Sequence, residues 1–187
     1  NYAIIYVDGR CNMKCGFCIH AAVDARATPS SITPKQWGQI FKRANSLLHL
    51  TVTGGEPFLR KDFVEIIDNI ILKCNVPRIS IKSNGFYVNR IKEYIPKLIE
   101  KHPNTEFTLS ISLDGPEEIH DKVRVFKGAY KKVLETIAEM QQYRKKPNFF
   151  LRLASVITQD NKHILDKLFE ETASWPIDFH ELILLRD

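Results

Sequence analysis

The sequence lacks long apolar runs, secretion signals, repeats and low-complexity stretches. A membrane helix needs about 20 consecutive apolar residues, and no segment of this 187-residue chain approaches that length. We therefore expect a soluble protein with no membrane partner. With no linker to divide it, the chain is long enough to bury one sizeable core. We expect a single domain over residues 1–187, in the reducing cytoplasm because nothing resembles a targeting segment.

A concentrated charge of one sign is also absent. The net charge is +5, but Lys and Arg are scattered among Asp and Glu, and the longest basic run, Arg144–Lys146, is short. A solvated helix surface explains such a run, so we expect no nucleic-acid partner. The chain begins at Asn1 rather than Met, and we expect it to be excised from a longer protein.

Cysteine is scarce, yet three of the four cysteines lie within eight residues, as Cys11, Cys15 and Cys18. This spacing lets one loop wrap three thiolates around a single centre. Three thiolates on a 4Fe–4S cluster would leave one iron without a protein ligand. With His20, the same run could instead form a closed zinc site. An odd number of close cysteines makes a disulfide framework the weaker alternative.

The hydrophobic periodicity predicts strands and helices in strict alternation. Six strand-like runs lie at Ala3–Val7, Leu48–Thr53, Arg78–Ser83, Glu106–Leu113, Phe149–Val156 and Phe179–Leu184. A capping box predicts the start of the first helix, with Thr33 as N-cap, Pro34 at the first position and Gln36 at the reciprocal position; this helix should end near Ser46. Four further helices are predicted at Asp62–Lys73, Val88–Lys101, Ala129–Tyr143 and Asn161–Ala173.

Six strands separated by helices imply parallel pairing with right-handed crossovers. Because six units fall short of the eight that close a barrel, we predict an α/β fold of the partial (βα)6 TIM-like barrel type. An open doubly wound sheet is the alternative that the periodicity leaves open.

Unusual polar or glycine-rich segments follow the ends of the predicted strands. They are the cysteine loop, Gly54–Pro57, Ser83–Gly85 and Ser112–Pro116. Each could be an ordinary turn. Ligands bind at this edge of parallel α/β folds, so four such segments together favour a binding site.

These motifs carry a family resemblance. The cysteine triplet in CNMKCGFC, GGEP at Gly54–Pro57, SNG at Ser83–Gly85 and SLDGP with HDKVR beyond it resemble the radical S-adenosylmethionine (radical SAM) enzymes. The branch is the one that includes molybdenum-cofactor, quinone-cofactor and peptide-maturation enzymes. The resemblance covers about Tyr2 to Leu185. It implies a radical SAM core with a 4Fe–4S cluster on the three cysteines and S-adenosylmethionine on the fourth iron.

The activity that this resemblance implies is reductive cleavage of S-adenosylmethionine. An electron donor such as flavodoxin or ferredoxin would reduce the cluster, and the resulting 5′-deoxyadenosyl radical would abstract hydrogen from a small-molecule or peptide substrate. No general acid, base or radical relay is identifiable. Relatives often continue into a C-terminal extension with auxiliary clusters, and none is present here. The alternative function is a non-catalytic zinc- or iron–sulfur-binding module.

The methionine end of the cofactor is assigned to the GGEP segment. Gly54 and Gly55 lack side chains, so their backbone can come close to the ligand. Exposed carbonyl groups, helped by Glu56, suit the ammonium group. Alternatively, Glu56 only caps the following helix.

The later motifs offer partners for the remaining groups. Ser83 and Asn84 suit the ribose hydroxyls or the carboxylate, or else form only a turn. Ser112 can donate to the carboxylate, and Arg124 offers a charged fork to the same group.

Arg124, Phe17 and Cys74 each have a supporting or structural interpretation. Arg124 could alternatively pair with Glu117 or Glu118 at the surface. Phe17 matches the family's aromatic residue near the adenine, by resemblance. Cys74 reads as a small buried apolar residue.

Overall fold

The computed structural model describes residues 1–18, 30–44 and 46–185, and a parallel six-stranded sheet lies at its centre. The strands are β1 (Tyr2–Tyr6), β2 (His49–Thr53), β3 (Arg78–Ser83), β4 (Glu106–Ser112), β5 (Phe149–Ile157) and β6 (Phe179–Leu184). They lie side by side in chain order, and every neighbouring pair is parallel. The predicted parallel sheet is confirmed, with each strand placed to within one residue at either end.

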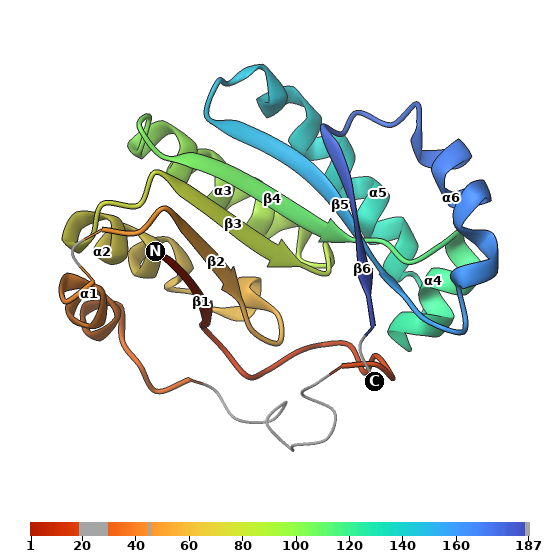
Figure 1. Cartoon of the computed structure of the whole chain (residues 1–187), viewed down its shortest axis with the longest axis horizontal. Coiled ribbons are helices and arrows are strands. Elements are labelled where there is room, and N and C mark those ends of the chain that lie inside the picture. The colour runs from red at the N-terminus through yellow and green to blue at the C-terminus, as the bar shows by residue number, and fades with distance from the viewer. Residues whose placement is uncertain (19–29, 45, 186–187) are drawn as a thin grey trace.

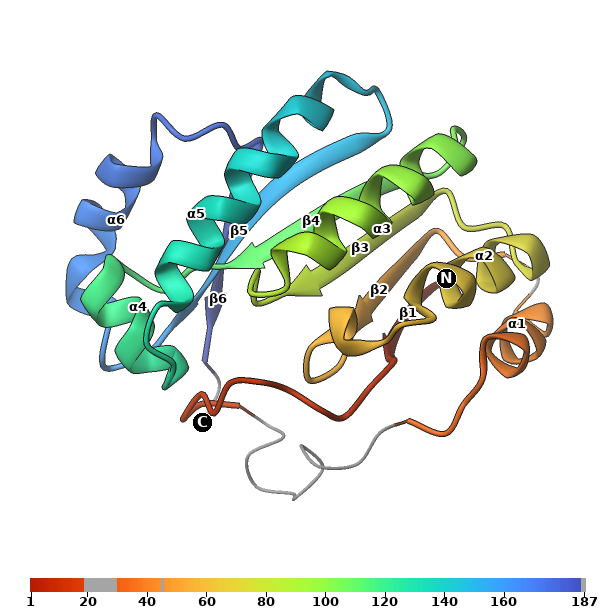
Figure 2. The ribbon, with the colours of Figure 1, turned by 180° about the vertical axis from the view of Figure 1, so that it is seen from behind.

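The helices pack on one face of this sheet and around its edge. They are α1 (Pro34–Lys42), α2 (Phe63–Lys73), α3 (Val88–Lys101), α4 (Glu117–Arg124), α5 (Ala129–Met140) and α6 (Leu165–Thr172), with short 3-10 helices η3 (Pro57–Leu59), η4 (Gln141–Lys145) and η5 (Lys162–Ile164). The sheet lies in front of α3 and α5 in Figure 1, and these helices lie in front of the sheet when the molecule is turned round in Figure 2. One face is therefore covered by helices and the other is open.

Two helices begin or end where local hydrogen bonds dictate. The capping box of α1 is confirmed, because Thr33 accepts from the Gln36 N–H and the Gln36 side chain accepts from the Thr33 N–H. This helix ends at Lys42, four residues before the predicted end. The last helix begins at Leu165 rather than Asn161. The side chain of Asn161 accepts from the Thr158 N–H and so closes the preceding turn.

The helix α4 was not predicted. Its eight residues include only two aliphatic side chains, Ile119 and Val123, which is too weak a hydrophobic period to indicate a helix. Buried polar contacts fix it instead, because His120 and Arg124 are both fully or nearly buried. This correction matters for the site, since Arg124 is the last residue of that helix.

Alternating residues divide each strand between the two faces of the sheet. On β4, Phe107, Leu109 and Ile111 are at most 1% exposed and belong to the core under the helices. Thr108 and Ser110 point to the opposite face. That open face is polar near its centre, so the hydrophobic core lies on the helical side of the sheet.

An ion pair shows that the open face is concave. Lys82 Nζ on β3 lies 2.6 Å from Glu181 Oε2 on β6, with β4 and β5 between them. Three strand spacings in a flat sheet would separate these strands by roughly 14 Å. The sheet therefore curls, and β1 and β6 are its two outer strands. The predicted partial barrel is confirmed, and the uninterrupted strand order excludes the doubly wound alternative, in which the order reverses.

Within the described ranges, none of the helices has both the length and the apolar character needed to cross a bilayer.

The two-faced sheet predicts a contrast between neighbouring substitutions on β4. Leu109→Ala should lower the free energy of unfolding by about 2–5 kcal/mol, since it removes a fully buried side chain from the core. Thr108→Ala, on the open face, should change it by about 0.5 kcal/mol or less. Urea unfolding of both variants measures the difference. Equal losses would contradict the placement of the core on one face.

Candidate functional site

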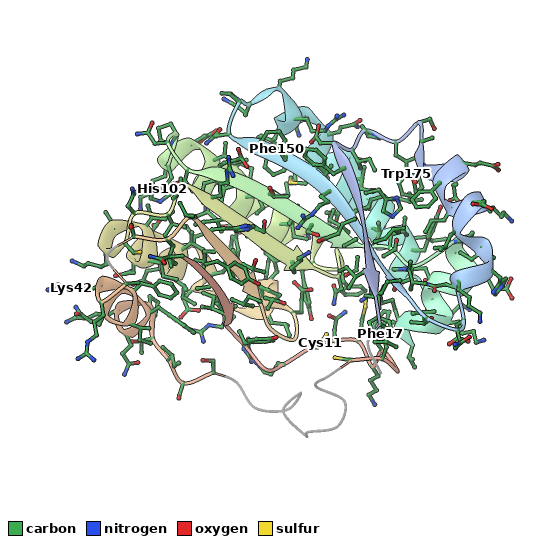
Figure 3. The ribbon with its side chains drawn as sticks, in the orientation of Figure 1. Cys11, Phe17, Lys42, His102, Phe150 and Trp175 are labelled. Carbon is green, nitrogen blue, oxygen red and sulfur yellow. The ribbon has the colours of Figure 1, made fainter. Side chains whose placement is uncertain are left out.

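One cavity of about 170 Å³ lies at the carboxyl ends of the strands, where the polar motifs meet. Ten of the eleven predicted site residues line it: Cys11, Cys15, Phe17, Cys18, Gly54, Gly55, Ser83, Asn84, Ser112 and Arg124. Figure 3 shows Cys11 and Phe17 together at this edge, at the opposite ends of the strands from His102 and Phe150. We call this space the thiol cavity; Glu56 is the predicted residue that does not line it.

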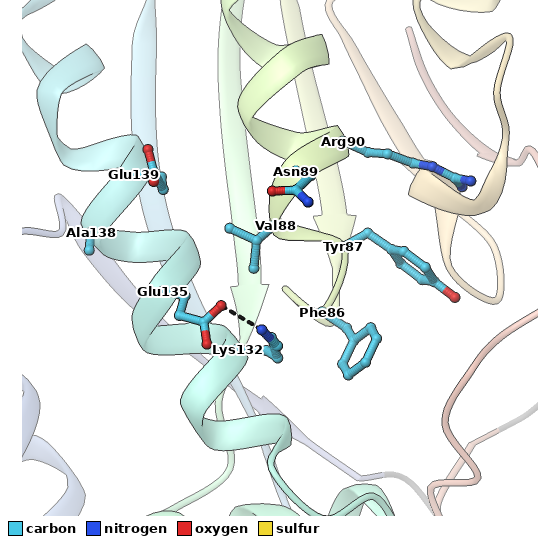
Figure 4. Close-up of a pocket in the computed structure, with 9 residues that line it drawn as sticks. All are labelled: Phe86, Tyr87, Val88, Asn89, Arg90, Lys132, Glu135, Ala138 and Glu139. Carbon is cyan, nitrogen blue, oxygen red and sulfur yellow. Dashed lines mark hydrogen bonds and ion pairs between the residues drawn. The ribbon is translucent and has the colours of Figure 1, made fainter.

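A larger hollow lies on the helical side of the sheet and is not this site. It measures about 610 Å³ and lies between the start of α3 and the exposed side of α5. In Figure 4, Lys132 and Glu135 on α5 pair with each other in its wall, with 2.6 Å between Lys132 Nζ and Glu135 Oε2. None of the cysteines lines it.

The GGEP segment is fixed to the cysteine loop by backbone hydrogen bonds. The Gly55 N–H donates to the carbonyl of Asp8 at 2.8 Å, and the Glu56 N–H donates to the carbonyl of Arg10 at 2.8 Å. These bonds continue the parallel pairing of β1 with β2 beyond the ends of both strands. Cys11 follows directly, so this pairing positions the first thiol.

The glycines are required by the protein's own packing. A Cβ on Gly54 would lie 2.4 Å from the carbonyl oxygen of Asp8, and one on Gly55 would lie 2.2 Å from that of Arg10. We expected the missing side chains to admit a ligand. Instead, the backbone that leads into Cys11 fills that space.

The carboxylate of Glu56 is completely buried and satisfied within the protein. It accepts from the Phe58 N–H (3.1 Å), the Ser83 hydroxyl (3.0 Å) and the Asn84 N–H (2.8 Å). Direct contact with a ligand ammonium, our expectation from the sequence, does not fit this placement. The alternative role is present, because Glu56 caps η3. Burial nevertheless raises the pKa of Glu56 to about 7, although the hydrogen bonds from these three donors lower it.

Asn84 connects the SNG turn to the cysteine loop. Its amide nitrogen donates to Asn12 Oδ1 at 2.9 Å and lies 3.8 Å from Cys11 Sγ. Its amide oxygen accepts from the Phe86 N–H. Glu56, the turn and Cys11 thus form one continuous hydrogen-bonded assembly.

Arg124 lies in the wall of the thiol cavity and is 7% exposed. Its Nε lies 2.6 Å from Asp114 Oδ2, and its Nη1 lies 3.8 Å from Cys15 Sγ. The guanidinium carbon lies 5.3 Å from the centre of the Phe17 ring. Its Nη2 is buried without a hydrogen-bond partner in the described part of the chain. An unsatisfied buried guanidinium nitrogen suits an anionic ligand group.

The alternative prediction, that Arg124 pairs with Glu117 or Glu118 at the surface, is wrong, because Arg124 is buried and pairs with Asp114. Asp114 is fully buried, and its second oxygen accepts from the Val156 N–H. Its own N–H donates to His120 Nδ1 at 3.1 Å. Burial, with the nearby Arg124 charge, lowers the pKa of His120 to about 3. A neutral imidazole therefore braces the loop that holds Arg124.

The three clustered thiols are free and adjoin one cavity. Burial raises the pKa of Cys11 to about 11 and also raises that of Cys15. Metal binding to these thiols must therefore release protons. Three thiols on one cavity, beside an unsatisfied Arg124 nitrogen, fit a cluster with one iron open to a second ligand.

A mononuclear zinc site is not preformed in the described ranges, since no group there of three or more His, Cys, Asp or Glu side chains could hold a metal ion. His20, the fourth ligand of that alternative, lies outside the described residues. Cys74 is the C-cap of α2 and 2% exposed, away from the thiol cavity. The prediction that it is a buried apolar residue is confirmed.

Three residues of the thiol cavity carried no motif signal: Met13, Thr53 and Lys82. Lys82 precedes the SNG turn by one position. The two-residue alternation along β3 could have placed it on the open face, opposite the buried Ile81.

Comparison with known proteins gives the class. The model of the radical SAM superfamily matches residues 5–170, so the chain belongs to the radical SAM superfamily. The cofactors of this family are a 4Fe–4S cluster and S-adenosylmethionine, and its members are enzymes.

The relatives are distant and longer. The chain is 26% identical over 166 residues to the sporulation killing factor maturation protein SkfB of Bacillus subtilis (strain 168), covering 88% of this chain and 37% of SkfB. It is 25% identical to GTP 3′,8-cyclase of Synechocystis sp., covering 95% of this chain and 52% of that enzyme. The structure of native anSMEcpe with bound AdoMet matches with a TM-score of 0.76 at 19% identity, covering 100% of this chain and 51% of that one. The chain thus spans about half or less of their lengths.

Two glycines of the site predict opposite outcomes. Gly55→Ala should displace the backbone leading into Cys11, because its Cβ would meet the Arg10 carbonyl. We expect reduced iron binding and a lower melting temperature. Gly16→Ala, inside the cysteine loop, should keep both, since its Cβ would meet nothing within 4 Å. Iron content after anaerobic reconstitution measures this contrast, and full iron in Gly55→Ala would contradict the packing role.

Glu56 predicts a pH dependence of stability. Its folded pKa of about 7 lies above the ordinary value of 4.5, so the folded state keeps a proton that the unfolded chain releases. The stabilisation is fully present below about pH 4.5 and is lost as the pH rises to about 7. Relative to Glu56→Gln, wild-type stability should fall through this window, by at most about 1.4 kcal/mol per pH unit. The control Glu100→Gln, at an exposed position, should show the same dependence of stability on pH as the wild type. If Glu56→Gln also shows the wild-type dependence, the Glu56 carboxylate is ionised throughout and the prediction is wrong.

Proposed function

We propose that this chain is the catalytic core domain of a radical SAM enzyme, with Cys11, Cys15 and Cys18 holding a 4Fe–4S cluster. The observation that carries the proposal is the thiol cavity itself, where three thiols adjoin an unsatisfied Arg124 nitrogen. When bound and reduced, the cluster supplies the electron that cleaves S-adenosylmethionine, giving a 5′-deoxyadenosyl radical that abstracts hydrogen from the substrate.

The residues of the thiol cavity divide the binding of S-adenosylmethionine among them. Arg124 donates to the methionine carboxylate through Nη2, while Asp114 holds the guanidinium in place. Carbonyl groups of Gly54 and Gly55, which line the cavity, accept from the ammonium group. Glu56 positions this segment from behind.

The structure alters the expected division between the two serines. The Ser83 hydroxyl donates to Glu56 and accepts from the Gly85 N–H, so it has little capacity left for a ligand. The Ser112 hydroxyl has no hydrogen bond within the described part of the chain and lines the cavity. We therefore assign a polar group of the cofactor to Ser112, and the apolar wall near the adenine to Phe17.

The substrate reaches this site from the open face of the sheet. The described helices cover the other face, so we place the approach of a peptide or a small molecule on this one. The structure of Streptococcus suis SuiB bound to the precursor peptide SuiA, which has a similar fold, supports the peptide class. The partner that supplies electrons is a small redox protein such as flavodoxin or ferredoxin. Four free thiols suit the reducing cytoplasm.

The cysteines provide a direct test. We expect about four irons per chain after anaerobic reconstitution, and 5′-deoxyadenosine when the dithionite-reduced protein meets S-adenosylmethionine. Cys15→Ala should lose both, because the cluster then has two protein thiolates. Cys74→Ala should keep both and lose only stability, on the order of 1 kcal/mol. Stoichiometric zinc without iron uptake would instead identify a structural metal module, and equal iron loss in Cys74→Ala would mean four protein ligands.

Arg124 is tested separately by binding. Arg124→Met should reduce the affinity for S-adenosylmethionine by roughly ten- to a hundredfold, since a charge-assisted hydrogen bond is lost. Lys127→Met, an exposed change nearby, serves as the control. Unchanged affinity in Arg124→Met, with a full complement of iron, would remove Arg124 from the binding site.

A further inference from the structure

Three charged side chains meet at the centre of the open face, beside the thiol cavity. Lys82 Nζ lies 2.6 Å and Arg152 Nη2 lies 3.5 Å from the same oxygen, Glu181 Oε2. Arg152 Nε also donates to Ser110 Oγ at 3.3 Å. Two cations thus share one carboxylate, which leaves one positive charge in excess.

Among the residues that the structure describes, no further carboxylate pairs with Lys82 or Arg152. Arg78 and Glu106 pair with each other at the amino ends of β3 and β4, 3.9 Å apart. His49 on β2 lies within reach of these charges. Burial lowers its pKa, and the charges of Arg152, Arg78 and Lys82 lower it further, against a smaller opposite effect of Glu106.

The three side chains are partly open to solvent rather than sealed in the core. The exposed fractions of the side chains are 28% for Lys82, 19% for Arg152 and 37% for Glu181. Lys82 also lines the thiol cavity together with the cysteines. A ligand that reaches these cations therefore lies next to the proposed site of radical formation.

We propose that Lys82 and Arg152, which pair with Glu181 when no substrate is bound, form an anion-binding subsite that anchors a carboxylate group of the substrate. This inference rests on the proposed function and adds to it the chemical class of the substrate. Two cations converging from β3 and β5, on either side of β4, suit a planar carboxylate, and the fork of Arg152 can make paired hydrogen bonds to it. Glu181 reduces the repulsion between the two cations until the substrate carboxylate replaces it as a partner of at least one of them.

The carboxylate can belong to a free organic acid or to an acidic side chain of a peptide. Glutarate is the probe for the first source. A capped Gly-Asp-Gly peptide, compared with its Asn counterpart, is the probe for the second. Binding is measured by calorimetry on the iron-loaded chain, and the His49 ring resonances give its pKa in the same samples.

Wild-type protein should bind at least one of the two acidic probes, and the bound anion should raise the His49 pKa. Lys82→Met and Arg152→Met should each weaken binding about tenfold. Glu181→Gln should tighten it several-fold, because it removes the competing carboxylate. Lys35→Met, an exposed lysine on α1, should leave binding as it is.

Because the lysine and arginine variants should weaken binding and Glu181→Gln should tighten it, the proposal stays testable even if one variant folds poorly. Binding of glutarate alone identifies a small acid as the anchor, whereas discrimination between the Asp and Asn peptides identifies a peptide side chain. If neither acidic probe binds, or if binding is weaker in Glu181→Gln, the subsite is overturned. Cleavage of S-adenosylmethionine by the wild-type protein is assayed in parallel. Cleavage without anion binding refutes only the subsite, and anion binding without cleavage refutes only the proposed function.

Discussion

The site depends on the backbone pairing that continues beyond the ends of β1 and β2. The carbonyls of Asp8 and Arg10 accept from the N–H groups of Gly55 and Glu56, and only glycine fits at positions 54 and 55 beside them. This contact connects the cysteine loop to the rigid sheet. A cluster needs its thiolates at fixed positions, and here the sheet edge supplies them.

Buried polar groups then support this edge from both sides. Glu56 receives three hydrogen bonds and fixes the SNG turn, which contacts Cys11 through Asn84. On the far side, Asp114 holds Arg124 against Cys15. Each of these residues is largely buried, and partially satisfied buried networks are costly. Arg124 lines the thiol cavity, and its Nη2 is buried without a hydrogen-bond partner among the described residues, so a ligand can contribute a missing hydrogen bond there.

The fold and most of the cavity could be predicted because they leave local signals. Alternating apolar residues locate the strands, and glycine-rich or polar motifs follow the ends of the first four of them. The roles of individual residues could not be predicted in the same way. Glu56 reads as a ligand residue from its motif, but it is buried and accepts hydrogen bonds from nearby Phe58 and from Ser83 and Asn84 of the distant SNG turn. The helix α4 has almost no apolar period, and the Lys82–Glu181 pair depends on the curl of the sheet across four strands.

The central claim is that three thiols hold a four-iron cluster and leave one iron open to S-adenosylmethionine. Mössbauer spectroscopy of iron-57-loaded protein, recorded with and without S-adenosylmethionine, tests it directly. Our account predicts that one iron in four becomes distinct when S-adenosylmethionine is added, while the other three stay as they were. Four irons that do not respond to S-adenosylmethionine would contradict it.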